Sequence, residues 1–166
     1  MGRRASPILP SRALWQTALV VIALDQASKV LVVHLLGLHR SGVIELWPPY
    51  LTFRMAWNEG VNFGLLSSNS DLTRWLLIGV ALAISAWVLI WVRREPDNRR
   101  AQIAAGLLIG GALGNVIDRL IYGAVADFLN MSCCGIDNPY AFNVADIAIF
   151  AGAAGLILWT DRAKTP

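Results

Sequence analysis

The chain has 166 residues, of which 56% are hydrophobic and only 15% are charged, and its mean hydropathy is +0.54. This composition is too apolar for an ordinary soluble domain of the same length and indicates an integral membrane protein. The net charge of +3 says little by itself, because in a membrane protein the distribution of the positive residues sets the orientation. The length predicts one membrane-embedded domain, residues 1–166.

The first apolar segment covers about residues 13–36 and follows a short basic N-terminus. It is too long for the core of a cleaved signal peptide, and no small-residue cleavage site follows it. Asp25 and Lys29 interrupt the segment, four residues apart on one helix face and in the order that favours an ion pair. We therefore expect a first transmembrane helix that carries a charged pair.

A loop of mixed polar composition follows at about residues 37–74. Within it, residues 50–57 are rich in aromatic and β-favouring side chains and predict a short strand. The part around residues 63–66 could instead form a helix at the membrane surface, because apolar residues gather there.

Three more apolar segments come next, at about residues 75–92, 101–121 and 142–159. Each of the four is close to the roughly 20 residues that cross a 30 Å hydrocarbon layer. The small residues at 106–114 predict that the third segment packs closely on another helix. The sequence therefore predicts an all-α polytopic membrane protein with four transmembrane helices.

The positions of the Lys and Arg residues predict the orientation. Nine of the 14 lie in the N-terminus, the link at residues 93–100 and the C-terminal tail. Since cytoplasmic segments carry the excess of positive residues, both termini should be cytoplasmic. The loop at residues 37–74 and the one that follows residue 121 should then face outward together.

Asp127 and Asp146 lie on either side of the second outward loop. Asp127 should lie just beyond the third helix, and Asp146 about five residues into the fourth, so the two carboxyl groups could meet at the outer edge of the bilayer. Two neighbouring carboxyls do not easily both ionise, and an aspartic protease uses such a pair to activate water and protonate a carbonyl. Alternatively, Asp127 is a solvated loop residue and Asp146 a helix-terminal charge that the helix dipole favours.

Other polar groups lie within the predicted helices. Asn115 and Arg119 are four residues apart, one to two turns below the outer surface, where they could face a substrate. Asp118 points about 100° away from Arg119 around the helix. For Asp118, and for the pair in the first helix, a purely structural role between helices is an equal alternative to a direct one.

Neither metal nor cysteine chemistry is indicated. His34 and His39 are the only histidines, and neither neighbours the two aspartates, so no catalytic metal site is expected. Cys133 and Cys134 are adjacent and lack the spacing of a metal site, and we interpret them as loop residues without a chemical role.

Together these residues resemble the bacterial lipoprotein signal peptidases, the signal peptidase II family. The resemblance covers nearly the whole chain and rests on five motifs in order along four apolar segments. They are DQASK at 25–29, NEGVNFG at 58–64, GGALGNVIDR at 110–119, VADF at 125–128 and FNVAD at 142–146.

The resemblance implies an aspartic endopeptidase in the bacterial cytoplasmic (inner) membrane, with its active site at the outer face. It would remove the signal peptide from a prolipoprotein just before a Cys that carries a diacylglyceryl group. Membrane lipid would then be a partner, whereas no cofactor, metal or nucleic acid is implied. The loop at residues 37–74 would form a small extracytoplasmic β-platform.

The same resemblance implies roles for individual residues. Asp127 and Asp146 correspond to the catalytic aspartates of the family. Substrate binding falls to Asn58, Gly60, Asn115, Arg119 and Asn143, and structural support to Asp25, Lys29 and Asp118.

Two other classes of protein compete with this interpretation. A small transporter would hold its charges near the bilayer midplane and commonly shows two similar halves, and no internal repeat is visible here. A structural membrane anchor would leave the charged residues within the apolar segments unexplained.

Overall fold

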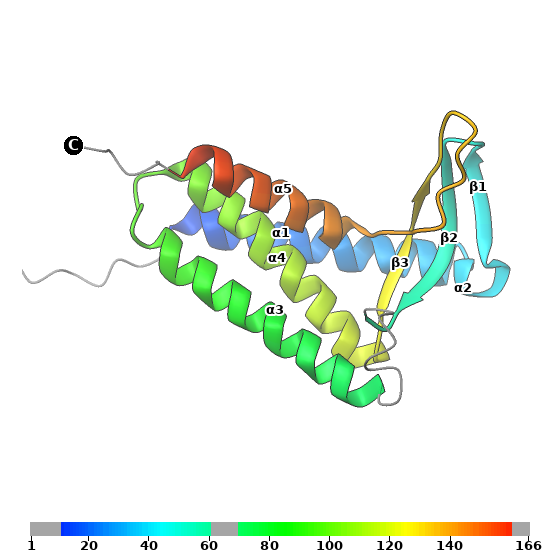
Figure 1. The fold of residues 1–166 in the computed structure, drawn as a ribbon, viewed down its shortest axis with the longest axis horizontal. Helices are drawn as coiled ribbons and strands as arrows, with labels where there is room; N and C mark the ends of the chain where they lie inside the picture. The colour runs from blue at the N-terminus through cyan, green and yellow to red at the C-terminus, as the bar shows by residue number, and fades with distance from the viewer. Residues whose placement is uncertain (1–10, 61–69, 161–166) are drawn as a thin grey trace, which may run out of the picture.

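A computed structural model of the chain describes residues 11–60 and 70–160. Four helices lie side by side, and a small sheet crosses one end of them (Figure 1). The long helices are α1 (Arg12–Lys29), continued by the π-helical segment η1 (Val30–Leu35), then α3 (Ser70–Val92), α4 (Arg99–Tyr122) and α5 (Val144–Trp159). A short helix α2 (Leu38–Ser41) leads from η1 into the sheet, whose strands are β1 (Val43–Trp47), β2 (Leu51–Asn58) and β3 (Val125–Met131).

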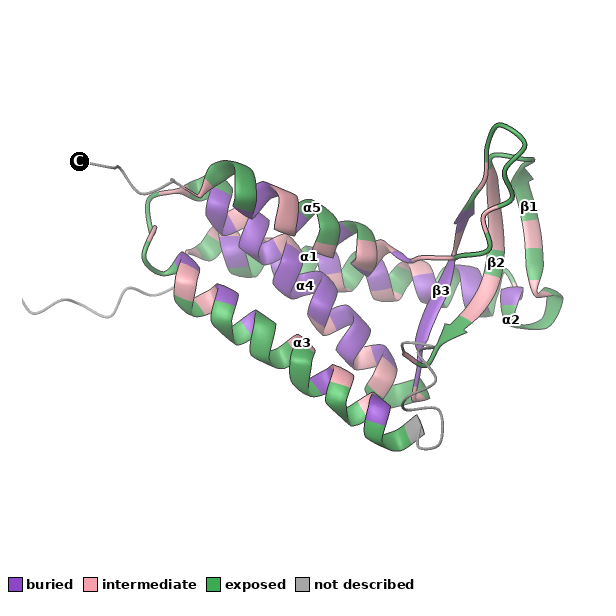
Figure 2. Ribbon diagram, in the orientation of Figure 1, coloured by how far each residue is buried: buried purple, intermediate pink, exposed green. Residues whose placement is uncertain are grey.

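Three of the long helical stretches, Arg12–Leu35, Asp71–Val92 and Arg99–Tyr122, are long and apolar enough to cross a bilayer. The fourth, α5, has 16 residues, which at 1.5 Å per residue span about 24 Å. The outer faces of these helices are largely exposed (Figure 2). Many of the exposed residues are apolar, such as Phe150, which is 79% exposed, as expected of helices that contact lipid. The four predicted segments are therefore confirmed as helices of a polytopic membrane protein.

Helix α4 lies at the centre of the bundle and is its most buried helix (Figure 2). A Cβ added at Gly110 would lie 2.7 Å from the carbonyl oxygen of Ala18, and one added at Gly114 would lie 2.8 Å from Oδ2 of Asp25. Glycine is therefore needed at both positions for α4 to approach α1 so closely. This confirms the close packing that the small residues predict.

The sheet is antiparallel, in the order β1-β2-β3, with Asn58 of β2 opposite Val125 of β3. Strand β2 confirms the predicted strand at residues 50–57. Strands β1 and β2 confirm the small β-platform that the resemblance implies for the loop at residues 37–74. We did not locate β1 or β3 from the sequence, and the alternative in which Asp127 is a solvated loop residue is wrong, because it is buried on β3 opposite Ala56. The pairing with β2 that creates β3 joins segments about 70 residues apart, so no local pattern reveals it.

An apolar cluster fastens the sheet to the end of α1. Its buried residues are Val32, Val33, Leu38, Ala126 and Phe128. The Phe128 ring also packs edge-on against Phe53 of β2, with 5.7 Å between ring centroids. Strand β3 is therefore held from both sides, by β2 and by the end of the first transmembrane helix.

Two boundaries differ from the prediction. Helix α3 begins at Ser70 rather than at residue 75, so it extends beyond the apolar segment that marks it in the sequence. Asp71 in its first turn interacts favourably with the positive end of the helix dipole. Helix α5 begins at Val144, so Asp146 is its third residue and not about the fifth in its segment. The alternative helix around residues 63–66 lies outside the described residues.

Cys133 and Cys134 are exposed in the turn that follows β3. Their Sγ atoms are 2.8 Å apart, and Ile136 N–H donates to the carbonyl of Cys133 at 2.9 Å to close the turn. Their expected position in a loop is confirmed.

Candidate active site

Asp127 and Asp146 are brought to one place because the chain that enters α5 pairs with β3, where Phe142 lies opposite Leu129. Asp127 is on β3 and is buried, with 3% of its surface exposed. Asp146 is half-buried in the first turn of α5. Its main-chain N–H is one of the first four of the helix, which have no partner within the helix itself. The sequence places them 19 residues apart, and the structure joins them through a third residue.

That third residue is Asn143, the N-cap of α5, which is fully buried. Its Nδ2 donates to Oδ1 of Asp127 at 2.7 Å. Its Oδ1 accepts from the N–H of Asp146 at 2.9 Å, and its own N–H donates to Oδ2 of Asp146 at 3.2 Å. One asparagine therefore caps the helix and holds both carboxyl groups.

Two further amides complete the contacts of the aspartates. Asn115 on α4 donates to Oδ1 of Asp146 at 2.9 Å, and Asn58 at the end of β2 donates to Oδ2 of Asp127 at 3.1 Å. Asn115 also accepts from Nδ2 of Asn143 at 3.2 Å. Each of the four carboxyl oxygens thus accepts a hydrogen bond, and three asparagines fix the orientation of both groups.

Burial raises the pKa of Asp127 from its ordinary 3.8 to about 6, and the negative charge of Asp146 adds to the increase. The hydrogen bonds from Asn58 and Asn143 and the positive charge of Lys29 act in the opposite direction. Asp127 is therefore a carboxyl group that keeps its proton to a higher pH than an ordinary aspartate does, which suits a general acid.

Arg119 lies beside this pair on α4. Its Nη1 donates to the carbonyl of Asn115 at 3.5 Å, while its buried Nε has no hydrogen-bond partner among the described residues. Its charge interacts with those of Asp127, Asp146 and Asp118. Within the described part of the chain, Arg119 is thus a cation with an unpaired buried donor, close to the two carboxyl groups.

Gly60 does not touch the aspartates, but it sets the position of Asn58. Its N–H donates to Oδ1 of Asn58 at 3.1 Å, which turns the Nδ2 of that amide toward Asp127. Gly60 has a φ of +123°, and a Cβ there would lie 2.7 Å from the side chains of Thr73 and Leu77 on α3. Only glycine allows β2 to end against α3 in this way.

A second layer of charge lies beneath the aspartates. The predicted pair of Asp25 and Lys29 is confirmed, with 2.7 Å between Oδ2 and Nζ, and Lys29 reaches Asp118 at the same distance. Gln26, which sequence reasoning missed, donates to Asp118 at 2.9 Å and to Asp25 at 3.1 Å. The sequence features that could have indicated a role for Gln26 are its position directly after Asp25 and its place within the DQASK motif at residues 25–29.

Among the described residues, three hollows on the surface of the protein lie close to the site. An apolar one of about 220 Å³ lies along α3, α4 and α5 and has Asn115 and Arg119 in its wall. Another, of about 410 Å³, lies on the outer side of α5 and is lined by Phe142, Asp146, Ile147, Phe150 and Ala151. Asn115 and Arg119 line the first hollow and Asp146 lines the second, so both apolar hollows border the polar site.

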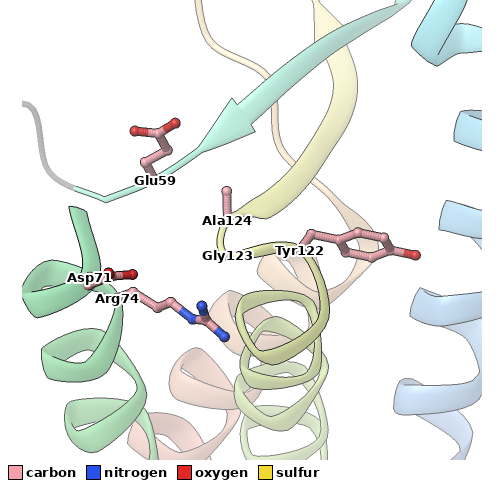
Figure 3. A pocket seen from close by; sticks show the side chains of 6 residues that line it. All are labelled: Glu59, Asp71, Arg74, Tyr122, Gly123 and Ala124. Atoms are coloured by element: carbon pink, nitrogen blue, oxygen red, sulfur yellow. The ribbon is translucent and has the colours of Figure 1, made fainter.

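The third hollow, of about 200 Å³, is polar and lies between the tops of α3 and α4 and the end of β2 (Figure 3). Glu59 and Arg74 line it, and Nη2 of Arg74 donates to the carbonyl of Leu120 at 3.0 Å. Arg74 was not predicted as a site residue. Its hydrogen bond satisfies one of the free carbonyls near the end of α4.

The described residues contain no group of three or more His, Cys, Asp or Glu side chains placed to hold a metal ion. The candidate site is thus built from two carboxyls, three carboxamides and one guanidinium.

Comparisons with known proteins agree with the motifs. The sequence matches the family described as signal peptidase (SPase) II over residues 17–161. A lipoprotein signal peptidase of Methylorubrum extorquens is 45% identical over 140 residues, which cover 84% of this chain and 80% of that protein. One of Methylobacterium radiotolerans is 42% identical over 154 residues, which cover 90% and 85% of the two chains.

A solved structure is also similar. It is a bacterial membrane enzyme determined by the in meso method at 1.9 Å resolution, and it superposes with a TM-score of 0.75 at 26% identity. The match covers 91% of this chain and 94% of that one. Because the family match and the relatives both span most of the sequence, the chain belongs to the signal peptidase II family.

Proposed function

We propose that the protein is an aspartic endopeptidase that removes the signal peptide from diacylglyceryl-modified prolipoproteins by cutting before the lipid-modified Cys. Membership of a peptidase family argues against the transporter and the structural anchor as alternatives. The observation that carries the catalytic assignment is the amide network in which Asn143 is hydrogen-bonded to both Asp127 and Asp146.

In the proposed reaction Asp146 is the anion and Asp127 holds the proton. Asp146 takes a proton from a water whose oxygen attacks the scissile carbonyl carbon, while Asp127 gives its proton to the carbonyl oxygen. When the C–N bond breaks, the proton on Asp146 goes to the leaving amine, and the proton on the former carbonyl oxygen returns to Asp127. Supporting this order, burial raises the pKa of Asp127 to about 6.

The hollows suit the two apolar parts of such a substrate. The one along α3, α4 and α5 would accept the apolar signal segment and ends at Asn115 and Arg119, which would bind the peptide near the cleaved bond. The one at Phe142, Ile147 and Phe150 opens toward lipid and would accept acyl chains. Buried acyl chains contribute about 0.8 kcal/mol per CH₂, so the lipid would supply much of the binding.

The proposed location is the bacterial cytoplasmic membrane. The positive residues favour cytoplasmic termini, and the sheet would then lie at the outer face, with Asp127 on its strand β3 and Asp146 at the adjoining start of α5. A signal peptide that ends at this surface would present its cleavage site at the depth of the aspartates.

The test is to incubate the purified protein with a diacylglyceryl-modified prolipoprotein in detergent or lipid, and to identify the products by mass spectrometry. We expect a mature product that begins at the lipid-modified Cys, with one water added across the cleaved bond. Products cut elsewhere, or none at all, would contradict the proposed substrate and reaction.

A further inference from the structure

Lys29 on α1 connects two buried carboxylates beneath the proposed catalytic pair. Its Nζ is 2.7 Å from Oδ2 of Asp25, on the same helix, and 2.7 Å from Oδ2 of Asp118, on α4. Asp25 and Asp118 are fully buried, and Lys29 is 5% exposed. A buried ion of this kind is retained only when its partners are fixed and its hydrogen bonds are made.

Each of these two carboxylates holds the main chain next to one catalytic aspartate. Oδ1 of Asp25 accepts from the N–H of Ala145 at 3.0 Å, and Ala145 immediately precedes Asp146. Oδ2 of Asp118 accepts from the N–H of Ala126 at 3.1 Å, and Ala126 immediately precedes Asp127. The start of α5 and the strand β3 are therefore tied to the same ammonium group through one carboxylate each.

The ties add to contacts that already hold these elements, which are the pairing of β3 with β2 and the packing of α5 on α4. Strand β3 and helix α5 meet at the site from different directions (Figure 1), and α1 and α4 are the helices to which both are attached. Gln26 adds a second, uncharged bridge, because its Nε2 donates to both carboxylates. The cluster of Lys29, Asp25 and Asp118 carries a formal net charge of −1, from one positive and two negative groups.

We propose that Lys29 is a positioning residue for the reaction: by fixing Asp25 and Asp118, it sets where the main chain at Ala145 and Ala126 places Asp146 and Asp127. The proposal rests on the catalytic role proposed above for these two aspartates. Lys29 touches neither of them, and it acts through its partners. Misplacing catalytic groups by about 1 Å can cost about 100-fold in rate, so small movements of the two ties would be visible in kcat.

Lys29 also acts on the site through its charge. The charged groups around Asp127 are Asp146 on α5, Lys29 and Asp25 on α1, and Asp118 and Arg119 on α4. Among them, Lys29 lowers the pKa of Asp127. Removing its charge raises that pKa, so Asp127 keeps its proton to a higher pH and the alkaline limb of the activity profile moves up.

Three variants separate position from charge. Lys29→Met removes the bridge and changes the net charge of the cluster from −1 to −2. Lys29→Arg keeps the charge but not the shape of the ammonium group. The double variant Lys29→Met with Asp118→Asn removes the bridge but returns the net charge to −1, because one negative and one positive group are lost together.

The experiment measures kcat and KM of each variant on a lipid-modified prolipoprotein across pH, with thermal unfolding of the purified protein as the check on stability. We expect Lys29→Met to lose about 10- to 100-fold in kcat with little change in KM, and its alkaline limb to move to higher pH. The double variant should keep the low kcat while its alkaline limb returns to that of the unchanged protein. Lys29→Arg should lower kcat without moving the limb.

Two results would overturn the positioning role. One is a Lys29→Met protein with the kcat and pH profile of the unchanged protein, and the other is a double variant whose kcat fully recovers. If Lys29→Met does not fold, the double variant and Lys29→Arg decide the question by the same criteria. Activity in Asp127→Asn or Asp146→Asn would instead overturn the proposed catalytic pair, which keeps the two failures distinguishable.

Discussion

Asn143 is the residue on which the proposed site depends most, because it contacts both aspartates and caps α5. Replacing it with Ser separates these two functions. A Ser side chain is also a good N-cap and can still accept from the N–H of Asp146. It is too short to do so and also donate to Asp127, so the 2.7 Å hydrogen bond from Nδ2 is lost.

The size of the effect follows from that bond. Leaving a buried group without its hydrogen-bond partner costs about 1–3 kcal/mol, and the loss of that much transition-state stabilisation corresponds to about 5- to 150-fold in rate. Asn and Ser cap helices about equally well, so the cap itself should change stability little, whereas the lost Nδ2 bonds to Asp127 and Asn115 should cost about 1–3 kcal/mol. Asn143→Ser should therefore be a folded protein with greatly reduced kcat/KM.

The pH profile should change as well. The hydrogen bond from Asn143 lowers the pKa of Asp127, which stands at about 6 in the intact site. Without that bond the pKa rises further, so Asp127 is protonated up to a higher pH. An acid that must be protonated governs the alkaline limb, and this limb should move upward in Asn143→Ser.

The assay is cleavage of a lipid-modified prolipoprotein over a range of pH, together with thermal unfolding. Asn143→Ala is the matched control, because it loses the cap as well and should be about 0.5–2 kcal/mol less stable than Asn143→Ser. Near-normal kcat/KM in Asn143→Ser, or an alkaline limb that stays in place, would refute the reasoning that Asn143 orients Asp127 and sets its protonation.

Three further outcomes are expected. A metal chelator should leave cleavage intact, because the carboxyl oxygens of the proposed pair are held by amide donors; loss of activity on dialysis against chelator, restored by one metal, would contradict this. An unmodified prolipoprotein with the same signal sequence should be cut far more slowly than the lipid-modified one, since acyl chains contribute about 0.8 kcal/mol per buried CH₂; equal rates in a side-by-side assay would remove lipid from recognition. Gly60→Ala should lower cleavage by displacing Asn58, because its Cβ would lie 2.7 Å from Thr73 and Leu77; Gly135→Ala, also at positive φ but with open space around it, is the control, and equal loss in both would show that backbone strain alone is responsible.

Much of the fold could be predicted because its helices are determined by apolar length. The four apolar segments and the pair of Asp25 and Lys29 could be predicted from local spacing. The segments are confirmed as helices, and the pair is confirmed as a salt bridge. Strands β1 and β3 could not be predicted, because β3 exists through its pairing with β2 and its packing on the end of α1. Strand β3 is also buried over most of its length, so it lacks the alternation that marks a half-exposed strand.

The site, like the fold, has features that local sequence predicts and features that depend on contacts between distant segments. Asp127 and Asp146 could be selected from the sequence as charges at the membrane edge, and their neighbourhood with Asn58, Asn115 and Asn143 is observed in the structure. The donor and acceptor in each of these hydrogen bonds could not be predicted, because they depend on how the chain entering α5 pairs with β3. The same is true of the ties from Asp25 and Asp118 to main-chain N–H groups, which belong to residues 120 and 8 positions away.

The most direct test of the central claim is the turnover of a lipid-modified prolipoprotein by purified Asp127→Asn and Asp146→Asn proteins. Asn keeps the size of the side chain but can be neither the anion nor the acid, so each variant should show no cleavage while remaining folded and in the membrane. Asp97→Asn, an exposed aspartate in the link between α3 and α4, is the matched control and should cleave normally. Near-normal turnover by either Asp127→Asn or Asp146→Asn would contradict catalysis by the two aspartates.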